Sequence, residues 1–219
     1  RLNIQILKPD INKSYTKFTV DGDKIRFGLG SVKNVGTSAV DEIVAERDRN
    51  GQFKDFTDFC ERIQETNVNK KCIESLIKAG AFDEFNETRR TLMESFESIL
   101  DTITSSNKKE LEGQVNMFDL GGSDSKEMKY TFKEFPEYSR KELLFMEKEM
   151  LGLYISGHPL DNIRHQIEMQ TNINSFQMRQ MENTDEIGDE IRQEIKDGQM
   201  VKYAGIILSL IHISEPTRP

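Results

Sequence analysis

Apolar side chains recur at the spacing of an amphipathic helix in four stretches, at about residues 37–50, 70–80, 86–100 and 139–152. The apolar residues of these stretches are Val40, Ile43 and Val44, then Ile73, Leu76 and Ile77, then Leu92, Phe96, Ile99 and Leu100, and finally Leu143, Leu144, Met150 and Leu151. Three phenylalanines that recur every third residue are expected to fill the core, namely Phe53, Phe56 and Phe59. The pattern therefore predicts four helices around an aromatic core.

Residues typical of helix ends support these boundaries. We expect Thr37 to cap the first helix and Gly51 to follow its last residue. Gly80 is expected to end the second helix. Ser139 and Glu142 have the spacing of a capping box, which predicts that a helix begins there.

Short runs of β-forming residues lie before the first helix. We expect Ile4–Leu7, Lys17–Val20 and Ile25–Phe27 to form a small sheet, with a hairpin loop at Asp21–Asp23. The apolar run Gln199–Leu208 predicts one more strand. The expected fold class is mainly α with a small N-terminal β element.

Helical periodicity is lost after residue 100. The polar stretches Ser105–Lys109 and Gly121–Ser125 favour a flexible linker, which we place at residues 101–135. An acidic helical pattern covers Glu182–Asp197. We expect six segments along the chain. They are the β element with a first hairpin (1–36), the helices that carry the two hairpin turns (37–100), the linker (101–135), a helical region (136–198), the strand (199–208) and a tail (209–219).

Composition and charge narrow the function classes. The 219 residues carry a formal net charge of −8, with 31% charged and 36% hydrophobic residues. The first 40 residues hold seven basic and three acidic side chains, so we expect any phosphate contact there. No apolar run is long enough to span a membrane, and two cysteines without a CxxC pair indicate a reducing cytoplasm.

The strongest local motif is the turn at residues 29–39, which has the pattern of a helix-hairpin-helix turn. Such a hairpin presents backbone N–H groups at a helix N-terminus, and these can bind a phosphate oxygen without recognising a base. Asn34 stands where the pattern has its first glycine, and asparagine tolerates the left-handed backbone that this position needs. The candidate DNA-binding residues are Lys33, Asn34, Val35, Gly36 and Thr37.

A second turn of this kind lies at Leu76–Phe82, with Lys78 and Gly80 as counterparts of Lys33 and Gly36. Either turn alone also fits an ordinary connection between helices. Two such units in tandem, next to a basic segment, indicate contact with duplex DNA.

The peptide Gln114–Phe118 places Met117 and Phe118 in the polar linker. We interpret these two side chains as anchors for an apolar groove on a partner, with the Gln114 amide fixing their orientation. The alternative is that the pair packs on its own domain. His158, His165 and His212 have no nearby metal-ligand pattern, and the sequence shows no catalytic motif, so we assign no catalytic or metal-binding residue.

Taken in order, the motifs resemble the catalytic alpha subunit of bacterial DNA polymerase III, a C-family polymerase. They are Pro9–Asn12, Ile25–Gly30, Lys33–Gly36, Glu74–Asp83, Gln114–Phe118 and Glu147–Pro159. The resemblance covers residues 1 to about 208, from the end of the fingers through a tandem helix-hairpin-helix module to the first strand of a truncated OB-fold. It implies that the parent protein is a DNA polymerase that uses Mg²⁺, with its catalytic palm outside this chain and no cofactor in the fragment.

The resemblance also implies the partners. These are double-stranded DNA, the sliding clamp (beta subunit), which residues Gln114, Met117 and Phe118 would bind, and other replicase subunits, with no membrane association. The alternatives are an accessory region of a repair nuclease or helicase that uses helix-hairpin-helix turns, and a free-standing interaction scaffold. Residues 209–219 lack the OB-fold pattern, and we expect them to be foreign to the natural gene.

Overall fold

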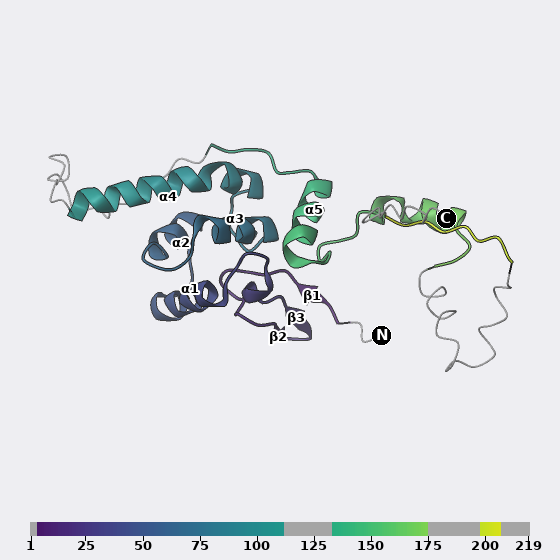
Figure 1. Ribbon diagram of the computed structural model, residues 1–219, viewed down its shortest axis with the longest axis horizontal. Coiled ribbons are helices and arrows are strands. Elements are labelled where there is room, and N and C mark those ends of the chain that lie inside the picture. The colour runs from purple at the N-terminus through teal and green to yellow at the C-terminus, as the bar shows by residue number, and fades with distance from the viewer. Residues whose placement is uncertain (1–3, 112–132, 175–197, 207–219) are drawn as a thin grey trace, which may run out of the picture. The chain divides into compact units, whose positions relative to one another are not determined.

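The computed structural model describes residues 4–111, 133–174 and 198–206 (Figure 1). The chain divides into two compact units, Arg1–Pro159 and Leu160–Pro219. The fold is mainly helical with one small sheet among the described residues, as the sequence predicted. The helix that follows Ser139 lies within the first unit.

A three-stranded sheet opens the first unit, in the order β1-β3-β2. Strand β1 (Ile6–Leu7) pairs in parallel with β3 (Lys24–Arg26), and β2 (Thr19–Asp21) pairs antiparallel with β3. Gly22 has a φ of 65° in the hairpin turn between β2 and β3, a conformation that favours glycine. The predicted hairpin is therefore present.

Among the described residues of the first unit, one 3₁₀ turn and five α-helices follow the sheet. The turn is η1 (Leu29–Ser31), and the helices are α1 (Thr37–Asn50), α2 (Phe56–Arg62), α3 (Lys70–Ala79), α4 (Arg89–Leu111) and α5 (Arg140–Leu151). Figure 1 shows α1, α3 and α4 in successive layers, with the sheet beside α1 and α5 next to α3.

Local sequence explains most helix ends. The Asn69 side chain accepts a hydrogen bond from the Cys72 backbone N–H and caps α3. Gly80 and Gly152 follow α3 and α5 in the left-handed conformation, and the Ser139 capping box is present. The expectation for Thr37 was wrong: Gly36 is the N-cap of α1, and Thr37 is its first helical residue.

An aromatic cluster lies at the centre of the first unit. The Phe53 and Phe59 rings are 5.1 Å apart between centroids, and Phe82 packs on Phe56 at 5.0 Å and on Phe59 at 4.9 Å. All four are buried, so the three phenylalanines predicted for the core are confirmed there. The connection after α3 completes this core through Phe82.

Helix α4 is longer than its apolar pattern indicated. We expected a linker from residue 101, but α4 continues to Leu111. The buried Ile103 side chain extends the packed face by one turn, and the hydroxyl of Thr104 donates to the carbonyl of Leu100 four residues earlier. A sparse apolar pattern is enough here because the helix is already nucleated by its packed first half.

The second unit contains the 3₁₀ turn η2 (Asp161–Ile163) and helix α6 (Arg164–Gln170). The predicted strand 199–208 is not formed in its described part, residues 199–206. This segment bonds to Asn172 through Lys202, whose backbone N–H donates to Asn172 Oδ1 and whose carbonyl accepts from the Asn172 backbone N–H. A strand needs a longer ladder with a neighbour, and one paired residue does not provide it.

Other expectations fall on residues that the structure does not describe. They are the clamp-binding peptide 114–118, the acidic pattern 182–197 and the tail 209–219. Over the described parts of the chain, no helix combines the length and the apolar character that a bilayer crossing needs.

Candidate nucleic-acid interface

The first hairpin turns between η1 and α1. The Val32 backbone N–H donates to the Leu29 carbonyl, and the Val35 N–H donates to the Val32 carbonyl. Both valine side chains are buried and anchor the turn in the core. Asn34 has a φ of 64° and is the one non-glycine residue with positive φ in the described chain. The left-handed backbone expected at Asn34 is confirmed.

Gly36 leaves the N-terminus of α1 open. A Cβ added at Gly36 would meet no atom within 4 Å. Within the described chain, no side-chain cap bonds the first turn of α1, and that turn holds no acidic residue. Such a helix end combines donor N–H groups with the positive end of the helix dipole, so it favours an anion.

The hairpin is held in place from three sides. The Lys33 backbone N–H donates to the carbonyl of Met150 at the end of α5, 2.9 Å away. Asn34 Nδ2 donates to Ser75 Oγ of α3 at 3.3 Å. Gly30 packs against the backbone near β2, because its N–H donates to the Thr16 carbonyl and a Cβ there would lie 2.8 Å from that oxygen. The turn is thus fixed while Lys33, Asn34, Gly36 and Thr37 stay exposed.

The second turn differs from the first. Gly80 is buried in the left-handed conformation, and the backbone N–H groups of Gly80 and Ala81 donate to carbonyls of α3. Lys78 is paired with Glu74, with its Nζ 2.6 Å from the carboxylate. The structure therefore brings Lys78 and Gly80 together at one turn but gives them internal partners.

The N-terminus of α4, which follows this turn, already holds a carboxylate. Glu137 accepts hydrogen bonds from the backbone N–H groups of Arg89 at 2.9 Å and of Arg90 at 3.3 Å. The guanidinium of Arg90 also lies over the rings of Phe135 and Tyr138. No pattern in the sequence indicates this contact, because Glu137 lies 48 residues after Arg89 along the chain.

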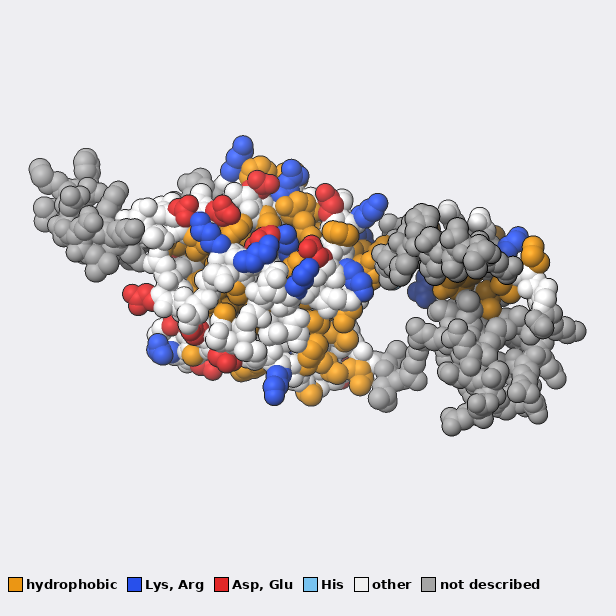
Figure 2. Space-filling model, viewed as in Figure 1, with side chains coloured by type: hydrophobic (Ala, Val, Ile, Leu, Met, Phe, Trp, Pro, Cys, Tyr) orange, Lys and Arg blue, Asp and Glu red, His pale blue; other side chains and the backbone are white. Residues whose placement is uncertain are grey.

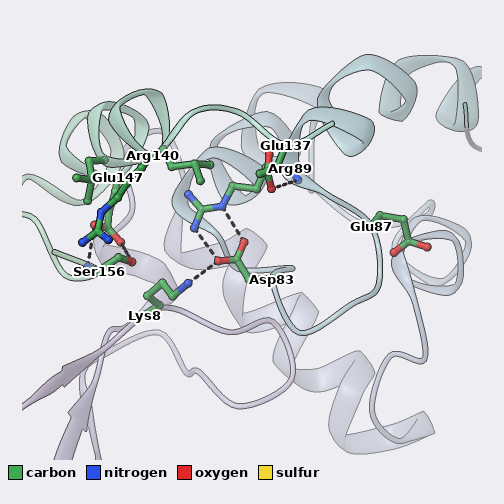
Figure 3. A pocket seen from close by; sticks show the side chains of 10 residues that line it. Lys8, Asp83, Glu87, Arg89, Glu137, Arg140, Glu147 and Ser156 are labelled. Atoms are coloured by element: carbon green, nitrogen blue, oxygen red, sulfur yellow. Dashed lines mark hydrogen bonds and ion pairs between the residues drawn. The ribbon is translucent and has the colours of Figure 1, made fainter. Parts of the chain in front are cut away.

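A cavity of about 440 Å³ lies beside the second turn. Figure 3 shows Asp83 between Lys8 and Arg89, with the nearest oxygen 2.6 Å from Lys8 Nζ and 2.7 Å from Arg89 Nη2. Glu147, at another wall, accepts from the backbone N–H groups of Ile155 and Ser156. Asp83 and Glu147 thus have internal partners, and the cavity lies along a polar seam between α5 and the turn.

Burial opposes ionisation of Asp83, but the hydrogen bonds and charges of Arg89 and Lys8 outweigh it and hold the Asp83 pKa below its ordinary value. Two lysines of the basic first segment pair with carboxylates that lie later in the chain. Lys8 pairs with Asp83, and Lys13 pairs with Glu84. Figure 2 shows Lys and Arg interspersed with Asp and Glu over the visible face of this unit. The excess of positive charge in the first 40 residues is therefore partly compensated by later carboxylates.

The His and Cys side chains of the described chain are the candidate metal ligands and nucleophiles. No group of three His, Cys, Asp or Glu side chains there is arranged to hold a metal ion. Cys60 and Cys72 are both buried, and burial raises the pKa of the Cys72 thiol to about 11. The ring of His158 packs edge-on against Tyr154.

Residues 3–92 match a family model described as a helix-hairpin-helix motif. This class agrees with the hairpin at residues 32–37 and the turn at residue 80.

The chain is similar to proteins named DNA polymerase III subunit alpha. It is 38% identical over 174 residues to the one from Borreliella burgdorferi, covering 79% of this chain and 15% of that protein. The identity is 41% over 169 residues for Saccharopolyspora erythraea, covering 74% and 14%, and 43% over 164 residues for Deinococcus radiodurans, covering 74% and 12%. The chain is therefore similar to one segment of DNA polymerase III alpha subunits and spans between 12% and 15% of the length of these relatives.

Proposed function

We propose that this chain is the part of a replicative polymerase that holds duplex DNA by its phosphate backbone. The single observation that carries the proposal is the open N-terminus of α1 at Gly36, beside the exposed Lys33, in a turn of the helix-hairpin-helix class. Backbone N–H groups and one lysine contact a phosphate without distinguishing bases. Binding is therefore independent of DNA sequence.

The two turns have unequal roles in this proposal. Lys33, Asn34, Val35, Gly36 and Thr37 form the phosphate-binding turn, with Val35 as its buried anchor. Lys78 and Gly80 were expected to bind a second phosphate in the same way. Their internal partners favour a supporting role for Gly80, while the Lys78 side chain is partly exposed in its ion pair with Glu74.

Titration of the chain against several unrelated duplexes tests DNA binding. Affinities should be similar for all duplexes and fall steeply as salt rises, because phosphate contacts release counterions. Marked preference for one sequence, or no binding at low salt, contradicts the proposal.

We further propose that Gln114, Met117 and Phe118 bind the sliding clamp. Burial of the Met and Phe side chains contributes roughly 1.5–3 kcal/mol each, so the isolated peptide should bind at about micromolar strength. On shared DNA the local concentration of the peptide is on the order of millimolar, so occupancy is high. The similarity to DNA polymerase III alpha subunits supports this assignment.

Replacing Met117 and Phe118 by Ala should abolish clamp binding on a sensor surface while leaving duplex binding unchanged. The matched control replaces the spacer residues Val115 and Asn116 by Ala and should bind the clamp nearly as well as wild type. Equal loss in both double variants would show that the two anchors are not specific.

At the level of the whole protein, we propose a DNA-directed DNA polymerase that acts in DNA replication in the cytoplasm and contacts other replicase subunits. Mg²⁺ belongs to the catalytic palm of that parent, and we assign no residue of this chain to it. The chain alone should not extend a primer in the presence of Mg²⁺. Primer extension by the purified chain would contradict this.

A further inference from the structure

One face of α3 carries three charged side chains next to Ser75. At about 100° per residue, Lys71, Glu74, Ser75 and Lys78 fall within an arc of about 100° around the helix. The apolar residues of α3 occupy the opposite side and are buried. The charged face is thus the solvent side of the helix, with buried Ser75 at its edge.

The contact made by Ser75 shows that this face of α3 lies next to the first hairpin. The Ser75 hydroxyl accepts the hydrogen bond from Asn34 Nδ2 of the first hairpin. Since Lys71 and Lys78 are one turn before and after Ser75 along the same face, they flank the point where α3 meets the hairpin. The phosphate-binding turn and the two lysines are therefore neighbouring parts of one surface.

Glu74 pairs with both lysines. Its two carboxylate oxygens lie 2.9 Å from Lys71 Nζ and 2.6 Å from Lys78 Nζ. The hydrogen bonds from Lys78 and Lys71 hold the Glu74 pKa below its ordinary value, so the carboxylate stays charged at neutral pH. The Glu74 carboxylate thus holds the Lys71 and Lys78 ammonium groups in place, and the three side chains together carry a net positive charge.

We propose that Lys71 and Lys78 form a second phosphate contact beside the hairpin, and that Glu74 takes the place of a DNA phosphate when no duplex is bound. This inference rests on the proposed DNA binding. A backbone phosphate that reaches the two ammonium groups displaces Glu74 as their partner, and the lysines already stand in position because the carboxylate has ordered them. Glu74 therefore weakens duplex binding by competing for the same cations.

The decisive comparison is between Glu74→Gln and a matched control, Asp101→Asn. Asp101 pairs with Lys70, 2.8 Å away, so each variant removes one carboxylate that pairs with lysine on α3, Asp101 with one lysine and Glu74 with two. Lys70 lies about 140° around the helix from Ser75, away from the hairpin. The two variants have the same net charge. They differ in whether the lysines that lose their carboxylate lie beside the hairpin or away from it.

For Glu74→Gln we expect duplex affinity at low salt to rise on the order of fivefold, the upper range for a surface ion pair. The slope of log affinity against log salt should steepen by about 0.9 for each phosphate gained. Asp101→Asn should change both quantities little, and Lys78→Gln should lower affinity and flatten the slope. Thermal unfolding of each variant confirms that the fold is intact.

Equal affinities for Glu74→Gln and Asp101→Asn, in a chain that binds duplex DNA, would overturn the role of Glu74 and leave the hairpin contact standing. Absence of duplex binding by the wild-type chain and by Glu74→Gln would instead contradict the proposed function itself. The two failures are thus distinguishable in one set of titrations.

Discussion

Arg89 and Asp83 form a bidentate ion pair directly beneath the turn that ends α3. Arg89 Nε and Nη2 donate to the two Asp83 carboxylate oxygens, both at 2.7 Å, and Nη1 donates to the Lys78 carbonyl (Figure 3). The guanidinium fills the space where a side chain at Gly80 would stand. The second turn is therefore held by a buried arginine, which explains both its shape and its need for glycine.

Replacing Gly80 by Ala should lower the free energy of unfolding by about 3 kcal/mol. Gly80 has a φ of 79°, and a Cβ there would lie 2.1 Å from Arg89 Nη2. Gly152 provides the control, because its φ is 76° but no atom lies within 4 Å of an added Cβ. Gly152→Ala should cost only about 1 kcal/mol, the contribution of the backbone conformation. Equal losses in urea unfolding would show that Arg89 can move aside.

Replacing Asp83 by Asn should destabilise the fold by about 2–3 kcal/mol at pH 7, because it leaves the buried Arg89 without its carboxylate. The pKa of Asp83 is lowered in the folded state, so the ion pair stabilises fully above the unfolded pKa of about 3.9. This contribution is lost as the pH falls through the lower folded value. The difference in unfolding free energy between wild type and Asp83→Asn should therefore shrink below about pH 4. A difference that stays constant down to pH 2 would contradict the assigned ion pair.

Asn34 should tolerate Gly better than Ala. The φ of 64° is open to glycine and costs an alanine about 1 kcal/mol. Both variants lose the same hydrogen bond to Ser75, so the difference between them measures the backbone alone. We expect Asn34→Ala to unfold at lower urea concentration than Asn34→Gly, and a reversed order would exclude a left-handed backbone at this position.

Local signals in the sequence were enough for much of the fold. Ser139 and Gly80 mark helix ends through contacts within four residues, and the structure has both of them. The left-handed backbone at Asn34 also follows from a local rule about which side chains tolerate it. Thr37 was misassigned by one position because Gly36 can cap a helix without a side chain.

Features that depend on distant contacts could not be predicted in this way. Strand 199–208 needed a neighbouring strand, and in its described part Met200 and Lys202 bond to the single residue Asn172 without forming a ladder. Glu137 reaches the N-terminus of α4 from 48 residues away, which no periodicity reveals. The pairing of Lys78 with Glu74 could have been predicted, because residues of opposite charge four positions apart on a helix commonly form an ion pair.

The most direct measurement of the central claim is duplex binding by Gly36→Asp. Gly36 has φ −76° and ψ 147°, which aspartate adopts readily, and an Asp at an N-cap stabilises a helix. The same carboxylate would occupy the N–H groups of α1 and repel a phosphate. Ser98→Asp, on the exposed side of α4, adds the same charge away from the hairpin. We predict that Gly36→Asp keeps or raises the melting temperature and loses at least tenfold in duplex affinity at low salt, whereas Ser98→Asp changes affinity little. Equal affinity of Gly36→Asp and Ser98→Asp for the duplex would contradict phosphate binding at the first hairpin.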